Sequence, residues 1–347
     1  MIDLNSLVAW FQSYQRDLPW RKTPSPYAVW VSEVMLQQTQ VAVVIPYYLR
    51  WMDQFPTVQA LAKAPLEQVI KAWEGLGYYS RARNLHLGAQ YVLEHFGGEL
   101  PAHKEGLLAI KGIGDYTVGA ILSFAFKQKA AAVDGNVQRV LSRLLGFEED
   151  LSKTQHKKTI QQLCERVLPE KEPWIVSEAL IELGALICTK KPRCLDCPLK
   201  KNCQAFLKAK TEQIPFKSQQ IKKEKIRRTV TIIKGEEAYL LRAVPPGEIM
   251  EGLYEFPYFE GHFEPVEIAA EIASRFSIQV RLEKKMAQVV HGFTRYQATL
   301  YPFICQAQFI KPILGFEWVN QGDLTNLPFS SGHRKILHAL DAVFIDN

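Results

Sequence analysis

Apolar residues recur at intervals of three and four along the first 207 residues, as in the run from Val31 through Val34 and Met35 to Val41. This period places the apolar side chains on one face of a helix, and proline and glycine mark the loops between such stretches. Strand-like alternation is absent there. The pattern predicts an all-α region with helices at about 4–14, 27–38, 41–53, 57–63, 66–73, 79–95, 104–110, 116–126, 133–144, 154–168, 173–187 and 199–207.

The pattern changes at residues 211–228, which hold one proline, few apolar residues and six basic residues. Such a composition is typical of a connector. Two interpretations remain open, a solvated linker and a basic arm that lies along a phosphate backbone.

Beyond residue 228 the apolar residues alternate. The segment TVTIIKGEEAYLLRAV predicts two strands joined at 234–237, and further strands are expected at 279–290, 295–308 and 315–319. Amphipathic helices are expected at 265–276 and 331–344. We therefore predict a multidomain chain with an all-α domain at 1–210, a basic linker at 211–228 and an α+β domain at 229–347.

Composition adds limits to this picture. A length of 347 residues with 47% hydrophobic content suits about two domains. The net charge of +6 and the pI of 8.8 permit a polyanionic partner. The segment 1–20 lacks the uninterrupted apolar core of a signal peptide, and the longest apolar run, 118–126, is too short for a membrane span. We expect a soluble, intracellular protein.

The stretch LAIKGIGDYTVGA at 108–120 joins two predicted helices through Gly112 and Gly114. Glycines permit a tight turn and leave backbone N–H groups at the start of the next helix, an arrangement that binds phosphate. An ordinary helix C-cap followed by a turn explains the same residues.

Four of the six cysteines fall within sixteen residues: Cys188, Cys194, Cys197 and Cys203. Thiolates at such spacing ligate zinc or an iron–sulfur cluster, and neighbouring lysines and arginines would face DNA in a binding protein. A structural zinc site with solvated lysines is the alternative.

Two carboxylates are candidates for chemistry. Asp134 follows an apolar run, starts a predicted helix, and has Asn136 two residues later to hydrogen-bond it. Glu33 lies among apolar residues, where burial would raise its pKa. A protonated glutamate paired with an ionised aspartate suits glycosidic bond cleavage. The alternatives are a simple N-cap for Asp134 and an exposed helix position for Glu33.

Aromatic residues and planar polar residues gather in the same half of the chain, which suits stacking on bases and reading their edges. The loop GLGYYSRARN at 75–84 combines two glycines, two tyrosines and two arginines, as a duplex wedge would. Core packing is the alternative for the tryptophans. The candidates are Trp20, Trp30, Gln37, Gln38, Thr39, Gln40, Tyr78, Tyr79 and Tyr116.

Taken together, these segments resemble the helix-hairpin-helix DNA glycosylases, and among them the MutY-type adenine DNA glycosylases. The resembling motifs are LPWR at 18–21, SEVMLQQTQV at 32–41, GLGYYSRARN at 75–84, GIGDYTVGA at 112–120, VDGNVQRV at 133–140 and the four cysteines. They follow the family order through the first 207 residues. The resemblance implies removal of adenine mispaired with 8-oxoguanine or guanine from double-stranded DNA.

Residue roles follow from the resemblance alone. Glu33 would protonate adenine and assist the incoming water, Asp134 would stabilise the oxocarbenium-like sugar with Asn136 orienting it, and Tyr116 would complete the catalytic group. Trp20, Arg21 and Glu178 would line the adenine pocket, while Gln38, Thr39, Leu76 and Tyr78 would contact 8-oxoguanine or insert beside it. Gly112 and Gly114 would hold the phosphate backbone, and Cys188, Cys194, Cys197 and Cys203 would carry a 4Fe-4S cluster.

Tyr116 discriminates within the superfamily, because endonuclease III-like relatives place a Schiff-base lysine at this position. Its absence predicts a monofunctional glycosylase, with Lys111 as a phosphate contact. Two alternatives stay open, a bifunctional glycosylase/lyase and a non-catalytic protein that binds DNA structures. The Glu33 and Asp134 pair argues against the second.

The second domain resembles the Nudix-like domain of the same family through GLYEFP at 252–257, without the glutamate-rich signature that holds catalytic magnesium. It would recognise the lesion through Phe293 and Thr294, with Arg295 in place of the usual histidine. The first cysteine gap has five residues where the family usually has six. The resemblance further implies a monomer that does not contact membranes, located in the bacterial cytoplasm at the nucleoid.

Overall fold

The computed structural model describes residues 2–218, 224–293 and 295–345. The chain forms two compact units. The first comprises residues 1–63 and 84–220, and the second comprises residues 64–83 and 221–347. The segment 64–83, which the sequence groups with the all-α domain, is thus part of the second compact unit.

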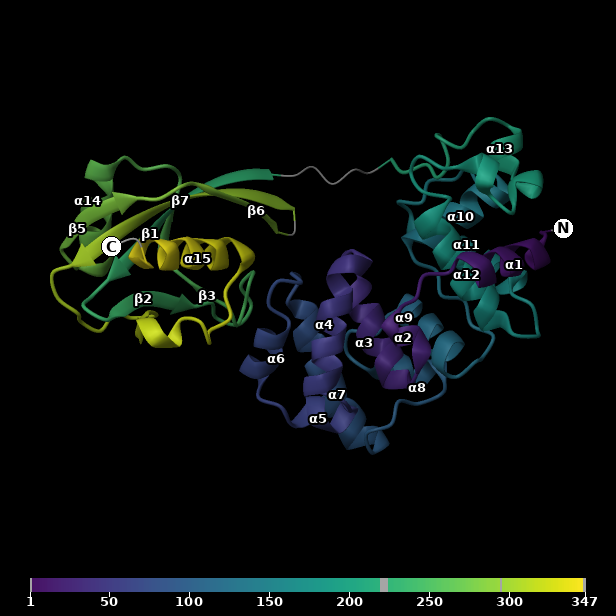
Figure 1. Cartoon of the computed structure of the whole chain (residues 1–347), viewed down its shortest axis with the longest axis horizontal. Helices are drawn as coiled ribbons and strands as arrows, with labels where there is room; N and C mark the ends of the chain where they lie inside the picture. The colour runs from purple at the N-terminus through teal and green to yellow at the C-terminus, as the bar shows by residue number, and fades with distance from the viewer. Residues whose placement is uncertain (1, 219–223, 294, 346–347) are drawn as a thin grey trace. The chain divides into compact units, whose positions relative to one another are not determined.

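Figure 1 shows the helices of this region, and their bounds follow the predicted periodicity closely. Buried apolar side chains from α1, α10, α11 and α12 form one core, which includes Leu7, Val140, Ile160 and Leu183. The helices are α1 (Leu4–Tyr14), α2 (Pro19–Lys22), α3 (Pro26–Leu36), α4 (Val41–Gln54), α5 (Val58–Lys63), α6 (Leu66–Ala72), α7 (Ser80–Phe96), α8 (Lys104–Ala109), α9 (Asp115–Ala120), η1 (Ile121–Ala125), α10 (Gly135–Leu145), α11 (Thr154–Val167), α12 (Pro173–Leu186), η2 (Cys194–Asp196), η3 (Lys200–Asn202) and α13 (Gln204–Leu207).

Three helical predictions need correction. The single turn α2 was not predicted, because four residues are too few to show a period. The helix expected at 116–126 is α-helical only as far as Ala120 and continues as the π-helical turn η1. The segment expected as one helix at 199–207 divides into η3 and α13. Among the described residues, no helix has the length and apolar character needed to cross a membrane.

The second unit contains a mixed eight-stranded sheet, in which β1 pairs parallel with β7 and every other pairing is antiparallel. The main path runs β3-β2-β1-β7-β5, while β4 pairs with β1, β6 with β7 and β8 with β2. The elements are β1 (Glu224–Lys234), β2 (Ala238–Ala243), β3 (Tyr254–Glu255), β4 (Tyr258–Glu260), α14 (Pro265–Phe276), β5 (Val280–Lys285), β6 (Val289–Phe293), β7 (Tyr296–Ala307), β8 (Glu317–Asn320), η4 (Gln321–Asp323) and α15 (Ser331–Ile345).

The two faces of this sheet carry one helix each. Successive strand residues point to opposite faces, so Ile232 packs with Leu337 of α15 while Ile233 packs with Ile272 of α14. Figure 1 shows α15 lying along one face of the sheet. Both faces are therefore covered, which explains why five successive residues of β1, 229–233, are buried.

The strand predictions also need refinement. The segment expected as one strand at 279–290 forms β5 and β6, separated by residues 286–288. The expected linker ends earlier than predicted, because β1 already begins at Glu224. The two-residue and three-residue strands β3 and β4 were not predicted, since they are too short for an alternating pattern to show.

Candidate functional site

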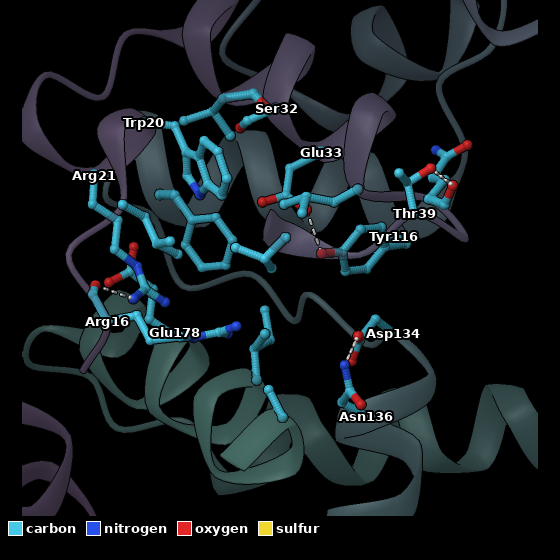
Figure 2. Close-up of a pocket in the computed structure, with 18 of the residues that line it drawn as sticks. Arg16, Trp20, Arg21, Ser32, Glu33, Thr39, Tyr116, Asp134, Asn136 and Glu178 are labelled. Carbon is cyan, nitrogen blue, oxygen red and sulfur yellow. Dashed lines mark hydrogen bonds between the residues drawn. The ribbon is translucent and has the colours of Figure 1, made fainter. Parts of the chain in front are cut away.

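A cavity of about 510 Å³ lies in the first unit, among α2, α3, α9, α10 and α12 (Figure 2). It brings together ten residues that the sequence had nominated from separate motifs. These are Trp20, Arg21, Glu33, Gln37, Gln38, Thr39, Tyr116, Asp134, Asn136 and Glu178. Because they come from segments up to 158 residues apart, the fold assembles the site.

Glu33 lies near the end of α3, a helix that is buried on every side, and only 6% of the residue is exposed. Burial raises its pKa from the ordinary value of 4.5 to about 7, and the negative charges of Asp134 and Glu178 add to this effect. A hydrogen bond from Tyr116 and the charge of Arg21 oppose the shift. Glu33 therefore exchanges its proton near neutral pH, as predicted from its apolar neighbours.

Tyr116 comes from the second helix of the glycine hairpin and donates its hydroxyl to Glu33 Oε2 (Figure 2). Burial raises the pKa of Tyr116 well above its ordinary value, and the charge of Glu33 contributes. The phenol thus keeps its proton and acts as a hydrogen-bond donor. It orients the carboxyl group of Glu33 toward the cavity.

Asp134 forms the N-cap of α10 and faces the cavity from the other side. Its Oδ1 accepts the Val137 backbone N–H at 2.7 Å, and its Oδ2 accepts the Asn136 side-chain amide at 2.8 Å. Burial raises the pKa of Asp134, while these hydrogen bonds and the charge of Arg139 lower it. The predicted hydrogen bond with Asn136 is confirmed, and the N-cap role is real as well.

Asn136 is itself held in place. Arg139 Nη2 donates to Asn136 Oδ1 at 2.8 Å and to the Gly184 carbonyl at 2.8 Å, and Arg139 Nε donates to the Cys188 carbonyl at 2.7 Å. A Cβ at Gly184 would lie 2.6 Å from Asn136 Cβ. Only glycine therefore lets α12 approach α10 closely enough for these bonds.

Trp20, Arg21 and Glu178 line the end of the cavity away from Asp134 (Figure 2). Trp20 is buried and packs edge-on against Tyr48, with ring centroids 5.4 Å apart. Burial raises the pKa of Glu178, and the charges of Arg21 and Lys127 oppose this rise. This end of the cavity offers an aromatic wall, a cation and a carboxyl group to a planar ligand.

Gln38 and Thr39 lie just after α3, at the mouth of the cavity. Gln38 has a φ of 58° in the left-handed region, which is uncommon for a residue with a side chain. Such backbone strain concentrates at functional sites.

The glycine hairpin stands outside the cavity. Gly112 has a φ of 87°, and a Cβ there would lie 2.7 Å from Asn84 Cβ, so both conformation and space require glycine. Gly114 precedes α9 as its N-cap, and a Cβ there would meet open space. Within the described residues, nothing in the fold demands glycine at position 114 for steric reasons.

Leu76, Tyr78 and Phe293 line a separate cavity of about 630 Å³ within the second unit. Tyr78 is 40% exposed and has a left-handed φ of 49°, whereas Leu76 is only 6% exposed. Thr294, the other nominated recognition residue, lies outside the described residues.

The four nominated cysteines follow α12, and three of them, Cys188, Cys197 and Cys203, pack beside the core of the first unit. Burial raises the pKa of the Cys197 thiol to about 11 and also raises that of Cys203, and the charge of Cys188 adds to both shifts. The Arg143 guanidinium lies 3.5 Å from Cys188 Sγ. Among the described residues, no three His, Cys, Asp or Glu side chains are spaced to hold a metal ion, so the cluster stays a prediction.

Two charged residues of the site were not nominated. Arg16 lines the cavity, and Glu182 lies behind it with a fully buried side chain bonded to both Arg16 and Arg21. A sequence signal for Glu182 exists, because Glu178 and Glu182 are the charged residues of the otherwise mostly apolar helix α12, and a buried acid needs a basic partner. Its partner Arg16 is 166 positions away in the sequence, so no local sequence pattern connects the two residues.

The arrangement separates two chemical functions across one cavity. One side carries a carboxyl group that holds a proton near neutral pH, and the other carries a carboxylate with fixed hydrogen-bond donors. This combination can protonate a leaving group while stabilising a positive charge that develops beside it.

Comparison with known proteins extends this description. Residues 31–169 match the family described as HhH-GPD superfamily base excision DNA repair protein, and residues 228–339 match the NUDIX domain. A solved structure of a thermostable thymine-DNA glycosylase is similar, with a TM-score of 0.55 and 28% identity over 59% of this chain and 95% of that chain. The predicted fold class, a helix-hairpin-helix glycosylase domain followed by a Nudix-like α+β domain, is confirmed.

Two curated relatives are informative. The adenine DNA glycosylase of Homo sapiens is 45% identical over 219 residues, or 60% of this chain and 40% of that protein. The adenine DNA glycosylase of Buchnera aphidicola subsp. Acyrthosiphon pisum is 33% identical over 310 residues, or 88% of this chain and 87% of that protein. The match thus spans about two-fifths of the human relative and nearly all of the bacterial one. The chain belongs to the adenine DNA glycosylase family.

Proposed function

We propose that this chain is a monofunctional adenine DNA glycosylase that hydrolyses the N-glycosidic bond of adenine opposite 8-oxoguanine or guanine in double-stranded DNA. The observation that carries the proposal is the placement of Glu33 and Asp134 in one cavity with contrasting surroundings. The match to an adenine DNA glycosylase over 88% of this chain supports the choice of base.

The first step is protonation of the base. An adenine flipped from the duplex enters the cavity of about 510 Å³, and unstacking costs less for a mispaired base. Protonated Glu33 transfers its proton to a ring nitrogen of adenine while Tyr116 holds the carboxyl group in place. The protonated base then leaves with the electron pair of the glycosidic bond.

The second step is stabilisation of the sugar cation. The carboxylate of Asp134, held by Val137 and Asn136, offsets the positive charge that develops at the sugar carbon. Water then attacks this carbon, and the Glu33 carboxylate accepts the proton that the water loses. The products are free adenine and an abasic site, and Glu33 regains its proton.

The absence of an amine at Tyr116 supports base removal without strand cleavage. Strand cleavage through a Schiff base needs a neutral amine that attacks the sugar carbon. Tyr116 is committed to Glu33, and Lys111 is exposed and does not line the cavity.

The four cysteines would hold a 4Fe-4S cluster. Their donor set suits this group because it is all thiolate and lies on one short segment, with Arg143 beside Cys188 to offset negative charge. When bound, the cluster would brace the loop that follows α12. Lesion recognition falls to the second unit through Tyr78, Phe293 and Thr294, without hydrolysis by that unit.

The decisive test is single-turnover base release from duplexes that carry adenine opposite 8-oxoguanine, guanine or thymine. We expect release from the first two and much slower release from the third. Equal rates on all three would refute lesion recognition. Borohydride treatment during turnover should trap no protein–DNA adduct, and a trapped adduct would refute the monofunctional mechanism.

The cluster has a separate test. Purified protein should be brown and contain about four iron atoms and four sulfides per chain, as expected for one 4Fe-4S cluster. A colourless, zinc-containing protein would refute the iron–sulfur assignment without touching the proposed reaction.

A further inference from the structure

Behind the base end of the cavity lies an ion triad of Arg16, Glu182 and Arg21, in which only Glu182 is fully buried. The Glu182 side chain is 0% exposed and accepts four hydrogen bonds. Arg16 supplies three of them, from its backbone N at 3.1 Å, Nε at 2.6 Å and Nη2 at 3.1 Å. Arg21 Nη2 supplies the fourth at 2.9 Å.

Four hydrogen bonds fill the accepting capacity of a carboxylate. Burial works to raise the pKa of Glu182, but its bonds and charge contacts with Arg16 and Arg21 hold the pKa below its ordinary value. Glu182 is therefore a permanent anion with nothing left to offer a ligand. Its hydrogen bonds reach the cavity only through the arginines, and its charge also helps to raise the pKa of Glu178.

Arg21 is held in place but has hydrogen-bond donors to spare for a ligand. Its Nη2 donates to Glu182 and its Nη1 donates to the Arg16 carbonyl at 3.1 Å, while its guanidinium carbon lies 5.5 Å from the centroid of the Phe11 ring. These contacts use two of its five N–H donors. The side chain is 16% exposed and lines the cavity.

We propose that Glu182 and Arg16 are positioning residues that hold the Arg21 guanidinium so that its remaining donors meet an acceptor atom of the bound base. This inference rests on the proposed function. The geometry favours it over a purely structural triad, because a clamp between α12 and the loop after α1 would need only Arg16. The additional bond from Arg21 to Glu182 fixes the position of the Arg21 guanidinium, which lines the cavity.

Loss of this anchoring should act on the rate of base release more than on duplex binding. Phosphate contacts dominate the affinity of proteins for DNA, whereas small displacements at the reacting centre can slow chemistry about a hundredfold. Glu182→Gln replaces one accepting oxygen with a donor that opposes the arginine N–H groups.

The chain offers a matched control in Asp150, another buried carboxylate of the first unit. It accepts four hydrogen bonds, from the backbone N and Oγ of Ser152 and of Ser218, and does not line the cavity. Asp150→Asn therefore disrupts a saturated carboxylate without touching Arg21.

The test is a double-mutant cycle in single-turnover release of adenine opposite 8-oxoguanine. We expect E182Q to slow release 10- to 100-fold, with less than a threefold change in duplex Kd and no comparable slowing in D150N. Against an Arg21→Met background, E182Q should add less than a twofold effect. Independent, multiplicative effects of the two substitutions would overturn the proposal.

If E182Q fails to fold, Arg16→Lys enters the same cycle, since it keeps the charge but loses the forked contact with Glu182. A readout independent of catalysis separates this inference from the proposed function. The Arg21 Nη2–H that bonds to Glu182 should give a sharp NMR resonance with slow solvent exchange in the unmodified protein and in D150N. It should broaden in E182Q or R16K, and an unchanged Arg21 resonance would refute the positioning role whether or not the chain releases adenine.

Discussion

Glu33 and Asp134 face the same cavity from opposite sides, and burial raises the pKa of both, but more hydrogen-bond donors oppose the rise at Asp134. Glu33 is part of a fully buried helix and has one hydrogen-bond donor, Tyr116, so burial prevails and its pKa rises to about 7. Asp134 caps a helix and has two donors within 2.8 Å that favour its anion. The comparison shows that the number of hydrogen-bond donors around each carboxyl group, rather than whether the residue is Glu or Asp, distinguishes the proton carrier from the fixed charge.

The largest expected effect comes from removing the proton carrier. Glu33→Gln keeps the shape of the side chain but has no proton to transfer, so base release should slow by about 10³-fold. The measurement is single-turnover release at pH 7, together with duplex binding. Binding should stay within threefold.

Glu165→Gln is the matched control, because Glu165 is an exposed glutamate on α11 outside the cavity. It should leave the rate unchanged. A Glu33→Gln rate within tenfold of the unmodified protein would remove Glu33 from the acid role.

Removing the negative charge of Asp134 should slow base release somewhat less than removing the proton of Glu33. Asp134→Asn retains an N-cap oxygen for the Val137 N–H but loses the negative charge, so release should slow by about 10²- to 10³-fold with little change in Tm. Asp134→Ala should slow release as much and also lower the free energy of unfolding by about 1 kcal/mol. Thermal melts beside single-turnover assays separate the two effects.

Equal melts for Asp134→Asn and Asp134→Ala would contradict the capping role. Equal rates for Asp134→Asn and the unmodified protein would contradict the charge role. The pair of variants thus tests the two functions of one carboxylate separately.

The raised pKa of Glu33 predicts a pH profile. Because the acid must carry its proton, release should fall as pH rises through about 7, with a slope approaching tenfold per pH unit. The hydrogen bond from Tyr116 lowers the pKa of Glu33, so Tyr116→Phe should raise that pKa and move the falling limb to higher pH. At pH 7 we expect release about 10- to 30-fold slower, since an oriented donor is lost.

A falling limb that moves to lower pH in Tyr116→Phe would contradict this assignment.

The raised pKa of Glu33 also makes the stability of the fold depend on pH. The pKa of Glu33 is higher in the folded state than its ordinary value of 4.5, so folding gains stability below that value and loses it as pH rises through about 7. Chemical denaturation of Glu33→Gln should lack this pH-dependent loss.

Much of this contrast was predictable from local sequence. The apolar neighbours Val31, Val34 and Met35 indicate that Glu33 is buried, and all three are buried in the structure. The two-residue spacing of Asp134 and Asn136 indicates their hydrogen bond. Both inferences need only the geometry of one helix or one cap.

The remainder depends on contacts between distant segments. Tyr116 bonds to a residue 83 positions away, and Glu182 bonds to Arg16 across 166 positions. Periodicity carries no information about such pairs, because it describes faces of single elements. The Tyr116 role came from family resemblance, while the triad had no comparable motif and was missed. Short elements such as α2 and β3 were missed because they hold too few residues to display a period.

The smallest expected effect comes from removing the hydrogen bond that Asn136 donates to the Asp134 carboxylate. Asn136→Ala removes the 2.8 Å bond to Asp134 but leaves the Val137 bond in place. The lost bond stabilises the Asp134 anion both before the reaction and in its transition state. Only the difference between these two stabilisations affects the rate, so release at pH 7.5 should slow only about three- to fivefold.

The effect should grow at low pH. Asn136 lowers the pKa of Asp134, so its loss raises that pKa and a larger share of Asp134 becomes protonated as pH falls toward 5. The ratio of rates between the unmodified protein and Asn136→Ala should therefore be larger at pH 5 than at pH 7.5. Gln138→Ala, on the same helix, should show a ratio near one at both values. A pH-independent ratio for Asn136→Ala would mean that Asn136 acts by packing against Gly184 rather than by stabilising the charge of Asp134.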